Sequence, residues 1–113
     1  YSPNQTSEIN KSFAATYRQK FQKEPPQFSA QTFTAVQVFV EALKAVDKQS
    51  EITKLPLEQL RTELNKQILA GKYKTPLGEI SFTPTGDVIQ KEFAVAQIKM
   101  DGNGNNGKFA FVK

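Results

Sequence analysis

Residues 29–47 read SAQTFTAVQVFVEALKAVD. Apolar side chains recur in this segment at spacings of three and four, which predicts an α-helix. One apolar stripe is widened by further residues around most of the helix: Phe33, Val36, Val40 and Leu43, then Ala35, Val38, Phe39, Ala42 and Val46. A helix this apolar is typically buried on more than one side. Because the chain has only 113 residues, we expect that part of the natural cover of this helix lies elsewhere.

A first helix is predicted over residues 6–23. Its apolar residues share a strict spacing of four: Ile9, Phe13, Tyr17 and Phe21. This spacing places them on one face of an α-helix. Thr6 or Ser7 can cap its start, and Pro25 ends it because proline disfavours helical geometry in the residue before it.

A third helix is predicted after Pro56, which suits a first helical turn because its missing N–H group would be unpaired there in any case. A narrow apolar stripe follows: Leu57, Leu60, Leu64 and Ile68. Gly71 then stands where a left-handed C-terminal cap is expected.

Beyond Gly71 the apolar period becomes the period of two that is typical of strands. Strands are predicted over residues 77–82, 92–100 and 108–112. Pro84–Asp87 is a turn signal after the first strand, and Asp101–Gly107 joins the other two as a hairpin. The predicted fold class is α/β or α+β, with three helices followed by about three strands. Three short strands would cover the apolar faces of the helices poorly. We therefore expect that the main sheet of the protein lies in another part of its sequence.

The composition excludes several functional classes. The chain has no Cys and no His, which removes the usual zinc sites and the Ser-His and Cys-His catalytic arrangements. Its net charge of +4 is spread along the chain, whereas a nucleic-acid site would be a dense basic stripe. Lys72, Tyr73 and Lys74 are the nearest approach to one. We therefore predict no enzyme, no cofactor and no nucleic-acid partner.

The segment after Met100 invites a calcium-loop interpretation, because Asp101 is followed by Asn103 and Asn105. Such a loop ends on a Glu at its twelfth position, where Val112 stands, and this one has no Asp at its third or fifth position. We predict a turn here and no metal site.

Four segments resemble motifs of one known family, in the same order. Residues 13–25, FAATYRQKFQKEP, are similar to its F-x-x-x-Y-x-x-x-Y/F-x-K-x-P helix, and residues 28–36 to the segment that follows it. Residues 78–88 are similar to its G-x-I-x-F-x-x-x-G-D signature, and residues 93–98 to its last strands. The chain thus resembles the C-terminal portion of periplasmic solute-binding proteins of ABC transporters, of type I and the branched-chain amino-acid type.

The resemblance implies two doubly wound lobes around a cleft that closes over a small ligand. Residues 1–76 would be the helical part of the first lobe. Residues 77–113 would supply a crossover strand and the C-terminal strands of the second lobe. The remainder of both lobes would lie in sequence beyond this fragment, which agrees with the missing cover expected for the helix at residues 29–47.

The same resemblance implies an extracytoplasmic solute-binding component of an ABC transporter, which binds amino acids or similar small polar solutes. Its partners would be that ligand and the membrane subunits of the transporter. It would lie in the periplasm or outside the cell, with or without a membrane anchor in the parent protein. The alternative is the ligand-sensing ectodomain of a receptor with the same two lobes, which a spanning helix in the parent protein would reveal. A carboxylate-based enzyme is a distant third.

The resemblance also implies two ligand-binding residues. The segment before the long helix approaches the cleft in such proteins, where Phe28 would wall the ligand and Gln31 or Thr32 would offer a hydrogen bond. The residues themselves allow a plainer interpretation. Phe28 can be a hydrophobic staple that packs on the first turns of the helix, and Gln31 can be an exposed residue at the helix start.

Uncovered apolar surface leads to a last expectation. One face of the strand predicted over residues 92–100 is wholly apolar: Ala94, Ala96, Ile98 and Met100. Contiguous apolar patches and unpaired strand edges are where soluble proteins associate. We therefore expect the isolated chain to self-associate, or to pair with the rest of its own protein.

Overall fold

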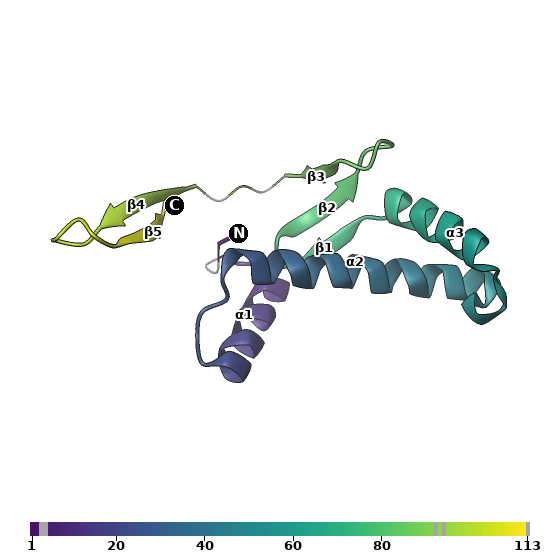
Figure 1. Cartoon of the computed structure of the whole chain (residues 1–113), viewed down its shortest axis with the longest axis horizontal. Coiled ribbons are helices and arrows are strands. Elements are labelled where there is room, and N and C mark those ends of the chain that lie inside the picture. The colour runs from purple at the N-terminus through teal and green to yellow at the C-terminus, as the bar shows by residue number, and fades with distance from the viewer. Residues whose placement is uncertain (3–4, 92, 94, 113) are drawn as a thin grey trace.

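The computed structural model describes residues 1–2, 5–91, 93 and 95–112. Helices come first and strands follow (Figure 1). The elements are α1 Glu8–Phe21, α2 Gln27–Ser50, the 3₁₀ helix η1 Ile52–Lys54, α3 Leu57–Ala70, β1 Tyr73–Thr75, β2 Gly78–Phe82, β3 Val88–Gln90, β4 Ala96–Met100 and β5 Gly107–Phe111. The α/β class and the three α-helices are confirmed. The described residues form five strands, in place of the three that the sequence predicts.

α1 begins and ends close to its predicted bounds. Ser7 is its N-cap, and the Ser7 hydroxyl accepts a hydrogen bond from the backbone N–H of Asn10 at 3.2 Å. Gln22 adopts the left-handed conformation at the other end, with φ 55°. The buried ring of Phe13 lies at the centre of an aromatic cluster. Its centroid lies 5.0 Å from that of Phe33, 6.0 Å from that of Tyr17 and 6.1 Å from that of Tyr1.

α2 is buried along one line only. Its buried residues share a spacing of four: Ala30, Thr34, Val38, Ala42 and Val46. The bulkier apolar residues remain in contact with solvent: Phe33 is 48% exposed, Val36 58%, Phe39 47% and Val40 39%. Burial on more than one side is therefore not reached within this chain. This outcome agrees with the expectation that part of the cover of α2 lies elsewhere.

Gly71 ends α3, but not in the way that the sequence predicts. Its φ is −75°, so the left-handed cap is wrong. A Cβ atom at this position would lie 2.2 Å from the hydroxyl oxygen of Tyr73. That hydroxyl donates to the carbonyl oxygen of Gln67 at 3.1 Å and lies 3.3 Å from that of Ile68. Gly71 therefore leaves room for Tyr73, whose hydroxyl group donates to backbone carbonyl groups in the last turn of α3.

The strands β1, β2 and β3 form an antiparallel sheet in that order. The sequence predicts β2 but not β1 or β3, because three residues are too few to display a period of two. The core between sheet and helices contains Val38, Tyr73 and Ile80, with Ile68 and Phe82 packed against them. The lobe boundary expected after residue 76 falls in the turn between β1 and β2, and it stays a prediction.

The strands β4 and β5 pair as the predicted hairpin, which we call the ribbon. Ala96 lies opposite Phe111, Ile98 opposite Phe109, and Met100 opposite Gly107. Because side chains alternate along a strand, all of these residues share one face, and that face is apolar. Ile98 is 61% exposed and Phe109 70%. β4 begins at Ala96 rather than at residue 92, and Ala94, the remaining member of the predicted face, lies outside the described residues.

The chain as a whole is extended. Its radius of gyration is 17.8 Å and its extents are 61 × 31 × 25 Å, whereas a compact domain of this length has a radius of gyration of about 13 Å. Figure 1 shows the ribbon at the opposite end of the molecule from α3. The extended shape leaves two apolar surfaces exposed. One is the apolar face of the ribbon, and the other, which we call the outer side of α2, carries Phe33, Val36, Phe39 and Val40.

Candidate functional site

The N-terminal end of α2 carries both residues that the sequence predicts as ligand contacts. Phe28 lies in the first turn and is 75% exposed, and Gln31 is exposed three residues later. Residues three apart lie on the same side of an α-helix. A staple residue precedes the N-cap, whereas Phe28 follows the N-cap residue Pro26. The staple interpretation is therefore wrong, and the ligand-contact prediction stays open.

The backbone at this end of α2 is suited to a polar group. Pro26 provides no side-chain cap, and the first turn has no acidic residue. The hydroxyl of Ser29 donates back to the carbonyl oxygen of Pro26 at 2.6 Å. The backbone N–H of Ser29 donates to the same carbonyl oxygen at 3.0 Å. The N–H groups of Gln27 and Phe28 precede it and have no intrahelical carbonyl to reach, and the helix dipole places partial positive charge beside them.

A groove of about 420 Å³ lies beside this helix end, between the segment that precedes α2 and the ribbon. Its lining comes from three parts of the chain: Tyr1, then Pro25, Pro26 and Gln27, then Ala96, Phe109 and Phe111. Phe28 and Gln31 are not among these residues. The structure thus brings the ribbon to the start of α2 without placing the two predicted contacts in the groove.

Sequence reasoning does not identify Phe109 and Phe111 as neighbours of α2. Their alternation within the last predicted strand is the only local signal, and it assigns both rings to one face of that strand. Which other segment that face meets depends on tertiary structure, and a local pattern does not contain this information.

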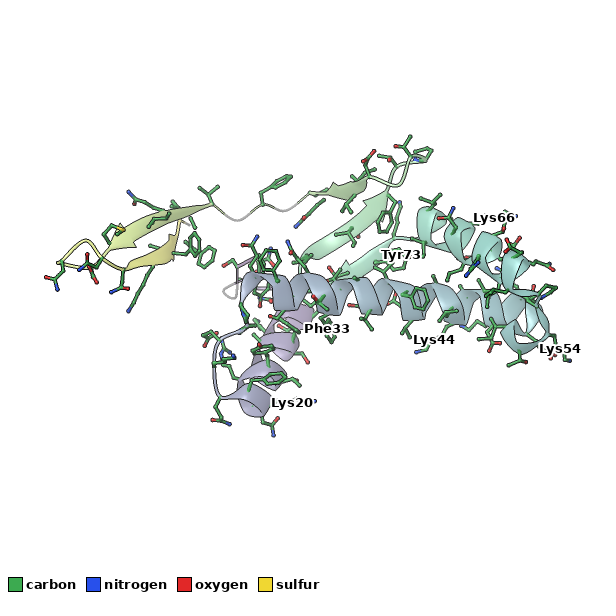
Figure 2. All side chains as sticks on the ribbon, viewed as in Figure 1. Lys20, Phe33, Lys44, Lys54, Lys66 and Tyr73 are labelled. Carbon is green, nitrogen blue, oxygen red and sulfur yellow. The ribbon has the colours of Figure 1, made fainter. Side chains whose placement is uncertain are left out.

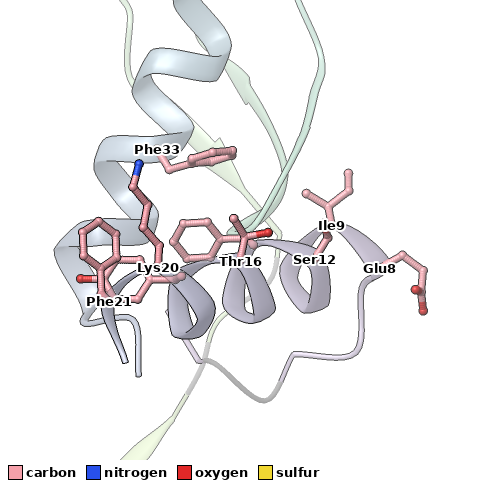
Figure 3. Close-up of a pocket in the computed structure, with 9 residues that line it drawn as sticks. Glu8, Ile9, Ser12, Thr16, Lys20, Phe21 and Phe33 are labelled. Atoms are coloured by element: carbon pink, nitrogen blue, oxygen red, sulfur yellow. The ribbon is translucent and has the colours of Figure 1, made fainter. Parts of the chain in front are cut away.

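A larger hollow of about 640 Å³ follows α1 (Figure 3). It is lined by the apolar stripe of α1 and one ring of α2, together with polar residues: Ile9, Phe13, Tyr17, Phe21 and Phe33, then Glu8, Ser12, Thr16 and Lys20. The rings of Tyr17 and Phe21 pack with their centroids 4.6 Å apart. Since most of this lining is aromatic or aliphatic, the hollow is suited to packing against further apolar protein.

The charged side chains lie at the surface, where neighbours of opposite charge form ion pairs such as Lys11 with Glu8 and Lys66 with Glu63. Figure 2 shows Lys20, Lys44, Lys54 and Lys66, which belong to α1, α2, η1 and α3. The Nε of Arg18 donates to Glu24 at 2.6 Å, and this hydrogen bond lowers the pKa of Glu24. Across the described ranges, no three Asp or Glu residues gather into a possible metal site.

The loop between β4 and β5 forms the turn that the sequence predicts. Both carboxylate oxygens of Asp101 accept hydrogen bonds from other residues of the same loop. Oδ1 accepts from the backbone N–H groups of Asn103 at 3.2 Å and Asn105 at 3.0 Å, and Oδ2 accepts from the side chain of Asn106 at 3.0 Å. The bond from Asn106 is the main reason that the pKa of Asp101 lies below its ordinary value.

A family model described as periplasmic binding protein matches residues 1–106. The chain belongs to the periplasmic binding protein family. The resemblance drawn from the four sequence motifs is thereby confirmed. Among curated proteins, none matches the sequence significantly. In the described part of this periplasmic binding protein, no helix has the length and apolar character that a membrane span requires.

Solved structures share the fold of this periplasmic binding protein. An ABC transporter substrate-binding protein from Desulfitobacterium hafniense is 20% identical, with a TM-score of 0.74 over 99% of this chain and 29% of its own length. The same figures hold for its complex with Leu. A solute-binding protein of an ABC transporter from R. palustris, in complex with benzoate, is 20% identical, with a TM-score of 0.72 over 99% of this chain and 27% of its own.

The chain thus spans less than a third of the length of these solved proteins. It is part of a type I periplasmic-binding-protein fold, in agreement with the incomplete cover of α2.

Proposed function

We propose that this chain is part of the extracytoplasmic solute-binding component of an ABC transporter. In its full length, that protein binds amino acids or similar small polar solutes and passes them to the membrane subunits. The family and the fold support a solute-binding role. Two of the similar structures hold Leu and benzoate, and both of these molecules combine a carboxylate with an apolar group.

Phe28 carries the proposal at the level of residues. A side chain that is 75% exposed contributes little to the stability of this chain, so its ring remains available to the apolar part of a solute. The side-chain amide of Gln31 and the N-terminal end of α2 offer hydrogen bonds to the polar part. In this proposal residues 1–76 are the helical part of the first lobe, and residues 77–113 supply a crossover strand and the C-terminal strands of the second lobe.

In the full-length protein, Phe28→Ala should weaken solute binding about tenfold and leave the melting temperature nearly unchanged. The loss of an aromatic contact of about 1.4 kcal/mol corresponds to this factor. Calorimetric titration with leucine and with benzoate, together with thermal melting, measures both effects.

Phe21→Ala is the matched control, because Phe21 is an aromatic residue of α1 that is 51% exposed and lies outside the proposed site. Its removal should leave binding unchanged. If Phe28→Ala binds normally and melts early, Phe28 has a packing role and the proposed site is wrong.

A further inference from the structure

We propose that Asn103 is a site of spontaneous deamidation, and that Asp101 protects the neighbouring Asn106 from the same reaction. Both asparagines precede a glycine in the exposed loop between β4 and β5: Asn103-Gly104 and Asn106-Gly107. Glycine has no Cβ to hinder an attack by its own backbone nitrogen. The sequence therefore contains two equivalent pairs, and the structure distinguishes them.

The reaction needs no enzyme, metal or redox partner. Hydroxide removes the proton from the backbone nitrogen of Gly104, and this nitrogen forms a bond to Cγ of Asn103. The bond from Cγ to Nδ2 breaks, and the leaving nitrogen takes a proton from water and departs as ammonia. Water then opens either side of the resulting succinimide ring, which yields aspartate or isoaspartate. The net change consumes one water, releases one ammonia and regenerates the hydroxide.

Asn106 is held on both its side chain and its backbone. Its Nδ2 donates to Oδ2 of Asp101 at 3.0 Å, and its carbonyl oxygen accepts from the N–H of Asp101 at 2.8 Å. Gly107 is the first residue of β5, opposite Met100. Attack on Asn106 requires its side chain to leave a carboxylate, and charge-assisted hydrogen bonds are roughly twice as strong as neutral ones.

Asn103 is held more loosely. Within the described part of the chain its side-chain amide makes no hydrogen bond, and its backbone N–H donates to Oδ1 of Asp101 at 3.2 Å. The bond that has to open is the neutral one from the N–H of Gly104 to the carbonyl oxygen of Asp101, at 3.0 Å. A Cβ at Gly104 would meet no atom within 4 Å, so no other part of the chain crowds this glycine.

Deamidation would change the charge at the tip of the ribbon. It lowers the formal net charge of +4 by one unit and places a second carboxylate close to Asp101. The two carboxylates would repel each other and compete for the same N–H donors of the loop. The isoaspartate product would also lengthen the loop backbone.

Incubation of the purified full-length protein at mildly alkaline pH, followed by trypsin and peptide mass mapping, tests the proposal. Cleavage after Lys99 and Lys108 releases one peptide that contains both asparagines, and its fragmentation locates the mass gain. We expect Asn103 to react about fivefold faster than Asn106, because only Asn106 has to give up a charge-assisted bond. The rate should rise with pH, since the attacking nitrogen has to lose a proton.

Two controls separate the structure from the sequence. In the chain unfolded by denaturant, the two rates should converge. In the folded chain, Asp101→Ala should raise the rate at Asn106 toward this common value. Alanine is chosen because an asparagine at position 101 would precede Gly102 and add another reactive pair. Asn106 reacting as fast as Asn103 in the folded protein, or unchanged by Asp101→Ala, would overturn the proposal.

Discussion

Tyr73 and Gly71 depend on each other at the end of α3. The ring of Tyr73 is 4% exposed, and its hydroxyl reaches the last carbonyl groups of the helix. Space for this ring exists because Gly71 has no Cβ. The sequence places the glycine correctly but assigns it a cap, because a glycine at a helix end most often provides one. The need for space beside the Tyr73 ring arises only in the tertiary structure, so the order of the residues does not reveal it.

Gly71→Ala should lower the free energy of unfolding by about 1–3 kcal/mol, as overpacking does. A φ of −75° suits alanine, so the loss would come from displacement of the Tyr73 ring. Gly102→Ala is the matched control, because its Cβ would meet no atom within 4 Å. Chemical denaturation compares the two variants, and equal stability would contradict the role given to Gly71.

The pH dependence of stability offers a second test of Tyr73. Burial raises its pKa above the ordinary value of 10.0, so the folded chain holds the phenolic proton more tightly than the unfolded chain. The stability that follows is fully present below pH 10.0 and is lost as the pH rises through the folded-state pKa.

Tyr73→Phe should remove this part of the alkaline loss, and Tyr17→Phe serves as the control for removal of a phenol from α1. Unfolding free energies measured on both sides of pH 10.0 provide the comparison. An alkaline slope that Tyr73→Phe leaves unchanged would mean that Tyr73 does not titrate in this way.

At the scale of elements, periodicity predicts the long helices and misses the shortest strands. α2 begins at Gln27, two residues before its predicted start, because the apolar pattern begins later than the helix. Its early start places Phe28 in the first turn of the helix rather than in the segment before it, which is incompatible with a staple and leaves the ligand-contact prediction open. The groove beside the start of α2 is lined by Pro25, Pro26 and Gln27 on one side and by Phe109 and Phe111, from the far end of the chain, on the other. Only the tertiary structure brings these parts together.

Two truncations to alanine test whether the outer side of α2 is covered in the full-length protein. Phe33 is 48% exposed in this chain, whereas Val46 is 1% exposed. If the rest of the family fold covers the outer side, Phe33→Ala should cost ~3–5 kcal/mol in the full-length protein and roughly 1–2 kcal/mol here. Val46→Ala should cost a similar amount in both settings. Denaturant unfolding of both lengths gives the four values. A cost of Phe33→Ala that does not change with length would mean that this side stays open.

At the scale of the whole molecule, two apolar surfaces lack cover. One is the outer side of α2, with Val36, Phe39 and Val40, and the other is the apolar face of the ribbon, with Ile98 and Phe109. A two-stranded hairpin alone is at best marginally stable in water, so the ribbon needs a neighbour. Both surfaces are accounted for when the chain is one part of a larger two-lobed fold. Without the remainder, contact with a second copy is the remaining way to remove them from water.

The isolated chain should therefore self-associate, and light scattering at several concentrations should show an average mass that rises with concentration. Val36→Lys and Ile98→Lys place a charge on one surface each, so the variant that restores the monomer identifies the surface in contact. Gln97→Lys, on the opposite face of β4 from Ile98, adds the same charge and should leave association unchanged. Addition of the rest of the protein should compete with self-association, because it covers the same side chains. A monomer at every concentration would mean that these surfaces tolerate water, and the inference of missing cover would then be wrong.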